Sequence, residues 1–66
     1  MLHTGEKIKE KLKEQGRTVV WFSKQINHNR TDVYSIFSRQ SIDTDLLLII
    51  SKVLNFNFFI FYTEQL

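Results

Sequence analysis

Four consecutive polar residues, Asn29 to Asp32, carry side chains suited to contacting nucleic acid. Arg30 can donate two parallel hydrogen bonds to N7 and O6 of guanine, and Thr31 can contact a thymine methyl group or donate to an acceptor. Asn29 is suited both to capping a helix and to contacting a phosphate, and these roles are compatible. For Asp32, capping toward Asn29 is favoured over acceptance from cytosine N4, because phosphates repel a carboxylate.

These residues open the second of two short helices that the apolar spacing predicts at about residues 19–26 and 30–38. The connection between them is too short for anything but a sharp turn, and Asn27 is a residue type that tolerates φ > 0. Thr18 and Asn29 each precede an apolar run and are good N-cap types. The apolar residues that define the two stripes are Phe22, Ile26, Val33 and Ile36. Two helices packed across a tight turn are the unit that places a recognition helix in the major groove.

The pattern resembles the Cro/repressor-type, or Xre-like, helix-turn-helix family of prokaryotic and phage transcriptional regulators. The resemblance runs from about Gly5 to Tyr62. It implies an all-α, compact five-helix lambda-repressor-like domain, with the helix-turn-helix at about residues 18–38. Ser23 falls where the family has a small residue that lets the two helices approach closely, and Asn27 replaces the usual turn glycine.

The chain departs from the family pattern at several positions. His28 replaces an apolar residue of the turn, and Val19 replaces a polar residue that reaches the phosphate backbone. Phe59 and Ile60 occupy positions that are commonly polar or acidic.

The residues expected to contact DNA are predicted from two things: their positions on the helix at about residues 30–38, and the resemblance to the family. The expected base-contacting residues are Arg30, Thr31, Tyr34 and Ser35. The expected phosphate-contacting residues are Thr18, Lys24, Asn29, Arg39 and Gln40. Arg39 and Gln40 match the family's backbone-contacting loop, which follows directly after the recognition helix. The implied partner is double-stranded DNA, recognised by base sequence.

Length and composition exclude several other classes of function. A chain of 66 residues is expected to form a single domain with little room for an enclosed catalytic pocket, and no catalytic constellation or phosphate-binding glycine loop is present. The absence of cysteine and of metal-ligand spacing predicts no metal, no cofactor and a reducing cytoplasmic location. No secretory signal is expected at the start, and the longest apolar run, Leu46 to Ile50, is far too short to span a bilayer. We therefore expect a DNA-binding protein that is not an enzyme, with no membrane or small-molecule partner.

The basic residues are unevenly distributed along the chain. They concentrate in residues 6–39, whereas residues 40–66 carry Lys52 alone against several carboxylates. A basic excess on the half with the predicted DNA-contacting helix is typical of nucleic-acid-binding proteins, although ordinary charge scatter on a solvated surface is the alternative. The alternating lysines of residues 7–13 are expected to form a solvated face, because residues two apart point to different sides of a helix.

Three further helices are predicted outside the central pair. The first runs from Gly5 to Gln15, with Thr4 as its cap and Gly16 ending it in the left-handed conformation. The next begins at Asp43 or Thr44, runs to about Leu54 as a mostly buried helix, and stops at Asn55. The last is capped by Asn57 and covers residues 58–62, although a terminal strand that pairs with a second copy is an open alternative.

The C-terminal segment from Phe56 to Tyr62 carries more apolar side chains than a short helix can bury. The residues expected at a homodimer interface are Phe56, Phe59, Ile60 and Tyr62. One alternative is that these side chains only fill the core of the domain. Another is that the chain is a protein-interaction or antitoxin-type module that uses this segment to bind a different protein.

Overall fold

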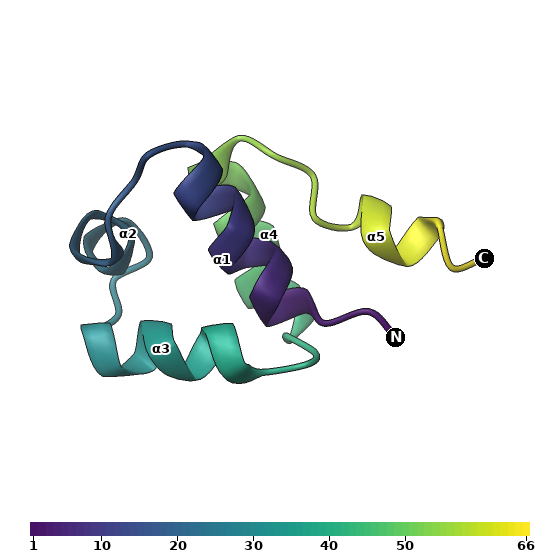
Figure 1. Ribbon diagram of the computed structural model, residues 1–66, viewed down its shortest axis with the longest axis horizontal. Coiled ribbons are helices and arrows are strands. Elements are labelled where there is room, and N and C mark those ends of the chain that lie inside the picture. The colour runs from purple at the N-terminus through teal and green to yellow at the C-terminus, as the bar shows by residue number, and fades with distance from the viewer.

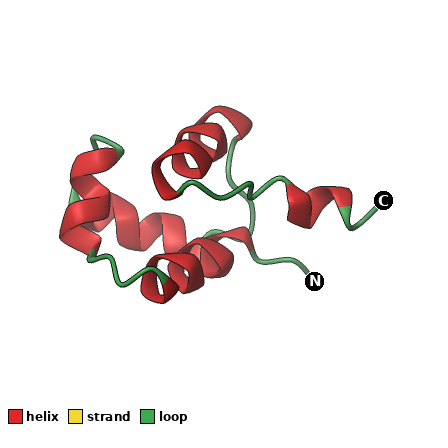
Figure 2. Cartoon of the chain, turned by 90° about the horizontal axis from the view of Figure 1, so that it is seen from above, coloured by secondary structure: helices red, strands yellow, loops and turns green.

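Five helices and no strands make up the chain in the computed structural model, which describes all of residues 1–66. The helices are α1 (Thr4–Glu14), α2 (Val19–Gln25), α3 (Arg30–Ser38), α4 (Thr44–Leu54) and α5 (Ile60–Thr63). Figure 1 shows α1 in front of α4, with α3 below both, α2 at one end and α5 at the other. Figure 2 shows that only loops join the helices. The expectation of a compact, all-helical domain is confirmed.

The core is a cluster of 12 buried apolar side chains, to which α1, α2, α3 and α4 all contribute. The phenyl rings of Phe22 and Phe37 stack with their centroids 6.5 Å apart and join α2 to α3. The remaining members of the cluster are Ile8, Leu12, Ile26, Val33, Ile36, Ile42, Leu47, Ile50, Leu54 and Phe58.

The longest helices, α1 and α4, have 11 residues each. None of the helices has the length and apolar character needed to cross a membrane.

Side-chain caps begin three of the helices where the sequence predicts them. The Thr18 hydroxyl accepts from the Trp21 amide at 3.0 Å, and Asn29 Oδ1 accepts from the Asp32 amide at 2.8 Å. Asp43, rather than Thr44, caps α4. Each cap satisfies one of the amides that the first turn of a helix leaves without a partner.

Residues with positive φ end the helices or turn the chain where the sequence predicts them. Gly16 has φ of 69°, Asn27 of 58° and Asn55 of 51°. After α1, the Arg17 amide donates to the Leu12 carbonyl and the Gly16 amide to the Lys13 carbonyl, which closes the helix end. These three positions set the direction in which the chain leaves α1, α2 and α4.

α1 begins one residue earlier than the sequence predicts and has a different cap. Nδ1 of His3 accepts from the Glu6 amide at 3.1 Å, whereas Thr4 is the first helical residue. Thr4 is buried, its amide donates to the Gln40 carbonyl, and its hydroxyl forms a hydrogen bond with the Tyr62 hydroxyl. The predicted Thr4 cap is wrong because contacts with distant parts of the chain occupy this residue.

The C-terminal segment is helical, not a strand, but its regular helix begins later than predicted. Asn57 Oδ1 accepts from the Phe59 amide at 3.0 Å, and a turn at Phe58 and Phe59 precedes α5. Phe58 is completely buried, and its amide donates to the Ser51 hydroxyl at 3.3 Å. Insertion of this ring into the core delays the start of α5.

Candidate nucleic-acid interface

α3 is buried along one side and exposed along the other. Val33, Ile36 and Phe37 face the core. The side chains on the opposite face are all exposed: Arg30, Thr31, Tyr34 and Ser35. The phenol of Tyr34 packs edge-on against Phe37, with ring centroids 6.3 Å apart, so the core holds this side chain in position. The structure thus brings the four predicted base-contacting residues together on one exposed face.

The α2 side of α3 is held by a tight turn. The His28 amide donates to the Ser23 carbonyl at 2.9 Å, which closes the turn around the left-handed Asn27. The buried Ser23 hydroxyl donates to the Val20 carbonyl at 2.8 Å, so this small side chain is satisfied within α2. A small buried residue here leaves room for α3 to approach α2.

The far end of α3 is held by α1. The Thr4 amide donates to the Gln40 carbonyl and the Gly5 amide to the Arg39 carbonyl, each at 3.0 Å. A Cβ atom on Gly5 would lie 2.5 Å from the Phe37 carbonyl oxygen and 2.6 Å from that of Arg39. Only glycine permits this approach of α1, which also fixes the backbone of the loop that carries Arg39 and Gln40. The sequence analysis missed this role of Gly5, because nothing near it in the sequence signals the contact.

The residues predicted to contact phosphate are all exposed: Thr18, Lys24, Asn29, Arg39 and Gln40. The ion pairs of the chain involve neither Lys24, Arg30 nor Arg39, so these cations are available to an anionic partner. The Asn29 carbonyl oxygen is engaged in capping α3, which leaves its NH₂ group free to donate. The two roles predicted for Asn29 are therefore geometrically compatible.

Asp32 makes a different contact from the one predicted. Its amide binds Asn29, but its carboxylate does not return a hydrogen bond to the Asn29 amide. Oδ2 of Asp32 instead lies 3.5 Å from Nδ1 of His28, one helical turn earlier. This contact draws the carboxylate toward the turn and makes the capping-box prediction wrong.

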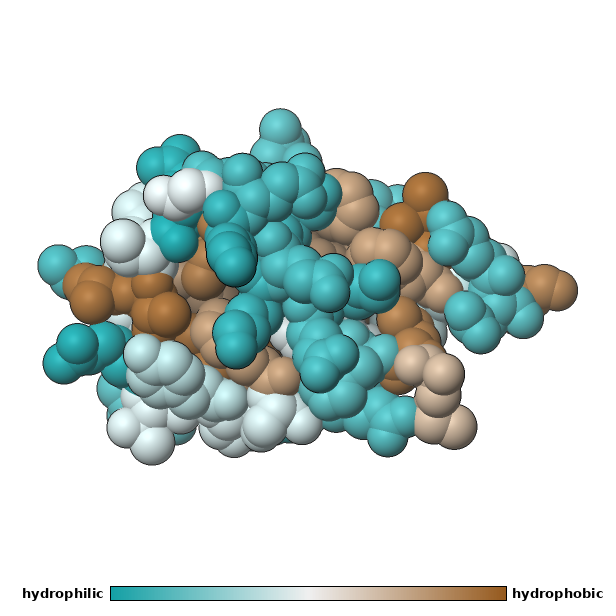
Figure 3. All heavy atoms as spheres, in the orientation of Figure 1, coloured by the Kyte–Doolittle hydropathy of each residue, from teal (hydrophilic) through white to brown (hydrophobic).

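The alternating lysines of α1 are divided between the solvent and the C-terminal segment. Lys11 Nζ lies 4.0 Å from the centroid of the Phe56 ring, and Lys7 Nζ lies 5.2 Å from that of Phe61. These cation–π contacts tie α1 to the C-terminal aromatic residues. Hydrophilic residues cover the middle of the molecule, where α1 lies, in Figure 3. The prediction of a purely solvated face is correct only in part.

Trp21 lines a shallow hollow together with Gln15, which follows α1, and with Val53 and Leu54 of α4. Its ring is half-buried against the core and is covered by the Arg17 guanidinium, 4.4 Å from the ring centroid. Arg17 is therefore engaged within the fold and differs from the free cations of α2 and α3.

A second exposed surface is apolar and lies on α4 and α5. Of the residues predicted at a homodimer interface, Ile60 is 43% and Tyr62 37% exposed, whereas Phe56 and Phe59 are half-buried against the core. α4 is not mostly buried as predicted, because its apolar residues Leu48 and Ile49 are 45% and 47% exposed. The apolar residues of α4 extend beyond a single stripe, and this excess was the signal that could have identified them.

Comparison of the chain with protein-family models, with curated proteins and with solved structures found no match. The functional inference therefore depends on the residues and on their arrangement.

Proposed function

We propose that the chain is a sequence-specific, double-stranded DNA-binding transcriptional regulator built as a lambda-repressor-like helix-turn-helix domain. In this proposal α2 and α3 form the helix-turn-helix, and α3 enters the major groove. The observation that carries the proposal is the exposed face of α3, where an arginine and three further polar side chains project together from a helix held at both ends.

The dimensions and chemistry of α3 suit this role. Nine helical residues extend about 14 Å, and an α-helix fits the B-DNA major groove, which is about 12 Å wide. Arg30 and Thr31 lie in the first turn of α3, and the N-terminal residues of a recognition helix commonly contact base edges. Lys24 and Arg39 lie before and after α3 and supply free cations for the flanking phosphates.

The proposal includes a homodimer that pairs through the C-terminal segment, chiefly through the outward side chains of Ile60 and Tyr62, with Phe59 beside them. Apolar side chains exposed in a short terminal helix are unfavourable in water unless a partner covers them. A two-fold pair would place two copies of α3 about one DNA turn apart, roughly 34 Å.

A second candidate function is a protein-interaction or antitoxin-type module. The exposed apolar residues of α4 and α5 favour it, because the same surface is suited to binding a different protein. In that case the exposed face of α3 would have no nucleic-acid partner.

Selection of bound sites from random duplex DNA tests the proposed function. We expect a conserved sequence in the recovered pool, with two half-sites about 10 base pairs apart, and an affinity that falls steeply as salt is raised. Recovery of no sequence preference at low salt, or an affinity that is independent of salt, would contradict the proposal and favour the protein-interaction module.

Replacing Arg39 with alanine is expected to weaken binding to all duplex sequences by a similar factor. The side chain is a free, exposed cation directly after α3, so it is placed to contact a phosphate rather than a base. Loss of one phosphate contact lowers the slope of log affinity against log salt by roughly one unit. Titrations at several salt concentrations measure this slope, and an unchanged slope would show that Arg39 does not contact phosphate.

Replacing Phe59 with glutamate and Ile60 with lysine is expected to give a folded chain that is monomeric at the low protein concentrations of DNA-binding experiments and that binds a single half-site weakly. The charges would oppose burial of α5 against a second copy. Sedimentation reports the assembly state, and circular dichroism reports the fold. Since Phe59 is half-buried against the core, Ile60→Lys alone serves as a milder variant that tests the interface without disturbing the core. A wild-type chain that is monomeric at the highest protein concentrations would contradict this interface.

A further inference from the structure

The outward face of α4 carries a compact strip of four exposed residues: Asp45, Leu48, Ile49 and Lys52. At 3.6 residues per turn these positions fall within an arc of about 100° on one side of the helix. The side chains of Leu48 and Ile49 are close to half exposed to solvent. Neither Asp45 nor Lys52 takes part in an ion pair within the chain. We refer to these four residues as the α4 strip.

The α4 strip is complementary to itself when two copies of the helix lie antiparallel. A two-fold axis that passes between Leu48 and Ile49 sets Leu48 of one copy opposite Ile49 of the other. The same axis sets each Asp45 opposite a Lys52, so opposite charges meet at both ends of the apolar contact. In parallel pairing, by contrast, each charge would face its own copy, which is unfavourable.

We propose that the α4 strip is a self-association surface at which a second copy of this chain packs antiparallel, with Leu48 against Ile49 and Asp45 against Lys52. This surface goes beyond the proposed function and is separate from the pairing of the C-terminal segment. The arrangement of Asp45 and Lys52 favours a second copy of the chain as the partner, because the strip itself supplies both members of each opposite-charge pair.

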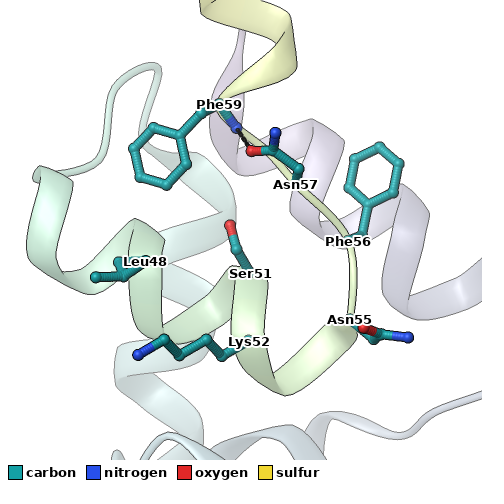
Figure 4. Close-up of a pocket in the computed structure, with 7 residues that line it drawn as sticks. All are labelled: Leu48, Ser51, Lys52, Asn55, Phe56, Asn57 and Phe59. Carbon is teal, nitrogen blue, oxygen red and sulfur yellow. Dashed lines mark hydrogen bonds between the residues drawn. The ribbon is translucent and has the colours of Figure 1, made fainter.

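A hollow beside the strip enlarges the apolar contact that a second copy can make. It has a volume of about 320 Å³ and lies between α4 and the segment that leads to α5. In Figure 4 the Phe59 ring lies on the same side of α4 as Leu48 and Lys52, whereas the Phe56 ring points the other way, toward α1. Even with this hollow the surface is small, so the pair is weak and forms as the protein concentration rises.

Antiparallel pairing has a consequence for the placement of α3. Residues 39–43 join the end of α3 to the start of α4, so the pair sets its two copies of α3 toward opposite ends.

Disulfide trapping tests the geometry directly, because the natural chain has no cysteine. Asp45→Cys and Lys52→Cys are prepared as separate variants and oxidised alone and as a mixture. Disulfides require Cα atoms within about 7 Å, so the mixture should cross-link at least about tenfold faster than either variant alone. Lys9→Cys, on the exposed face of α1, controls for random collision. Cross-linking of each single variant as fast as the mixture would overturn the antiparallel register.

Charge reversal tests the same pairing without cysteine. Asp45→Lys and Lys52→Asp should each weaken self-association by about tenfold when Ile60→Lys has removed the C-terminal pairing, because each creates two like-charge contacts. Mixing the two variants restores both opposite-charge contacts and should recover association in sedimentation experiments. Failure of the mixture to recover would overturn the proposal. DNA affinity measured on the same variants at low protein concentration should be unchanged, so failure of the α4 pairing and failure of the proposed DNA binding give different results.

Discussion

Replacing Gly5 with alanine is expected to lower the free energy of unfolding by about 3 kcal/mol. The added Cβ would lie 2.5 Å from the Phe37 carbonyl oxygen, 2.6 Å from that of Arg39, and closer still to that of Ile36. All three are backbone atoms, so no change of side-chain rotamer relieves the overlap. The start of α1 would have to move away from the end of α3 and would lose the hydrogen bonds donated by the Thr4 and Gly5 amides. For a domain of this size such a loss is a large fraction of the total stability.

Urea denaturation followed by circular dichroism measures the effect, and Gly16→Ala is the matched control. Gly16 has φ of +69°, but a Cβ there would meet nothing within 4 Å. The control should therefore cost only about 1 kcal/mol, from the left-handed backbone conformation alone. Equal destabilisation by the two substitutions would contradict the contact described for Gly5. A Gly5→Ala chain that folds should also bind DNA more weakly, since the Arg39 loop would shift.

Replacing Arg30 with alanine is expected to lower affinity for the selected DNA site while affecting random DNA much less. Arg30 lies at the start of α3, exposed and without an ion-pair partner. A bidentate contact of arginine with guanine contributes about 1–3 kcal/mol of discrimination at one base pair. The loss should therefore appear as a relaxed preference at one position of each half-site when binding sites are selected again.

Arg30→Lys separates base recognition from charge. Lysine keeps the positive charge but lacks the planar fork that matches the two guanine acceptors. We expect this variant to bind random DNA as the natural chain does and to lose much of the preference for the selected site. If Arg30→Ala weakens specific and random binding equally, and Arg30→Lys restores both, then Arg30 contacts a phosphate and the base-contact prediction is wrong.

The local elements of this fold were predictable because their signals lie within a few residues of the structures that they determine. Thr18, Asn29 and Asp43 cap the amide three residues later, and Asn27 and Asn55 take up the left-handed conformation. The exposed face of α3 followed from the same short-range spacing, since helical periodicity alone separates the buried from the exposed side.

Contacts between distant residues explain where the predictions were wrong or incomplete. Thr4 does not cap α1, because its hydroxyl forms a hydrogen bond with Tyr62 and its amide donates to Gln40. α5 starts late because Phe58 enters the core. Similarly, Lys7 and Lys11 lie on aromatic rings that come from the other end of the chain.

The sequence by itself determined the first four helices, the tight turn between α2 and α3, and the residues that α3 exposes, but it left open whether the C-terminal segment is a helix or a strand. Only the tertiary structure decided that α1 closes on the end of α3 at Gly5, and that α4 leaves Leu48 and Ile49 uncovered. The physical reason is that caps, turns and periodicity depend on neighbours along the chain. Burial and close approach depend instead on which surfaces meet in space, and the spacing of residues along one helix does not specify its partner.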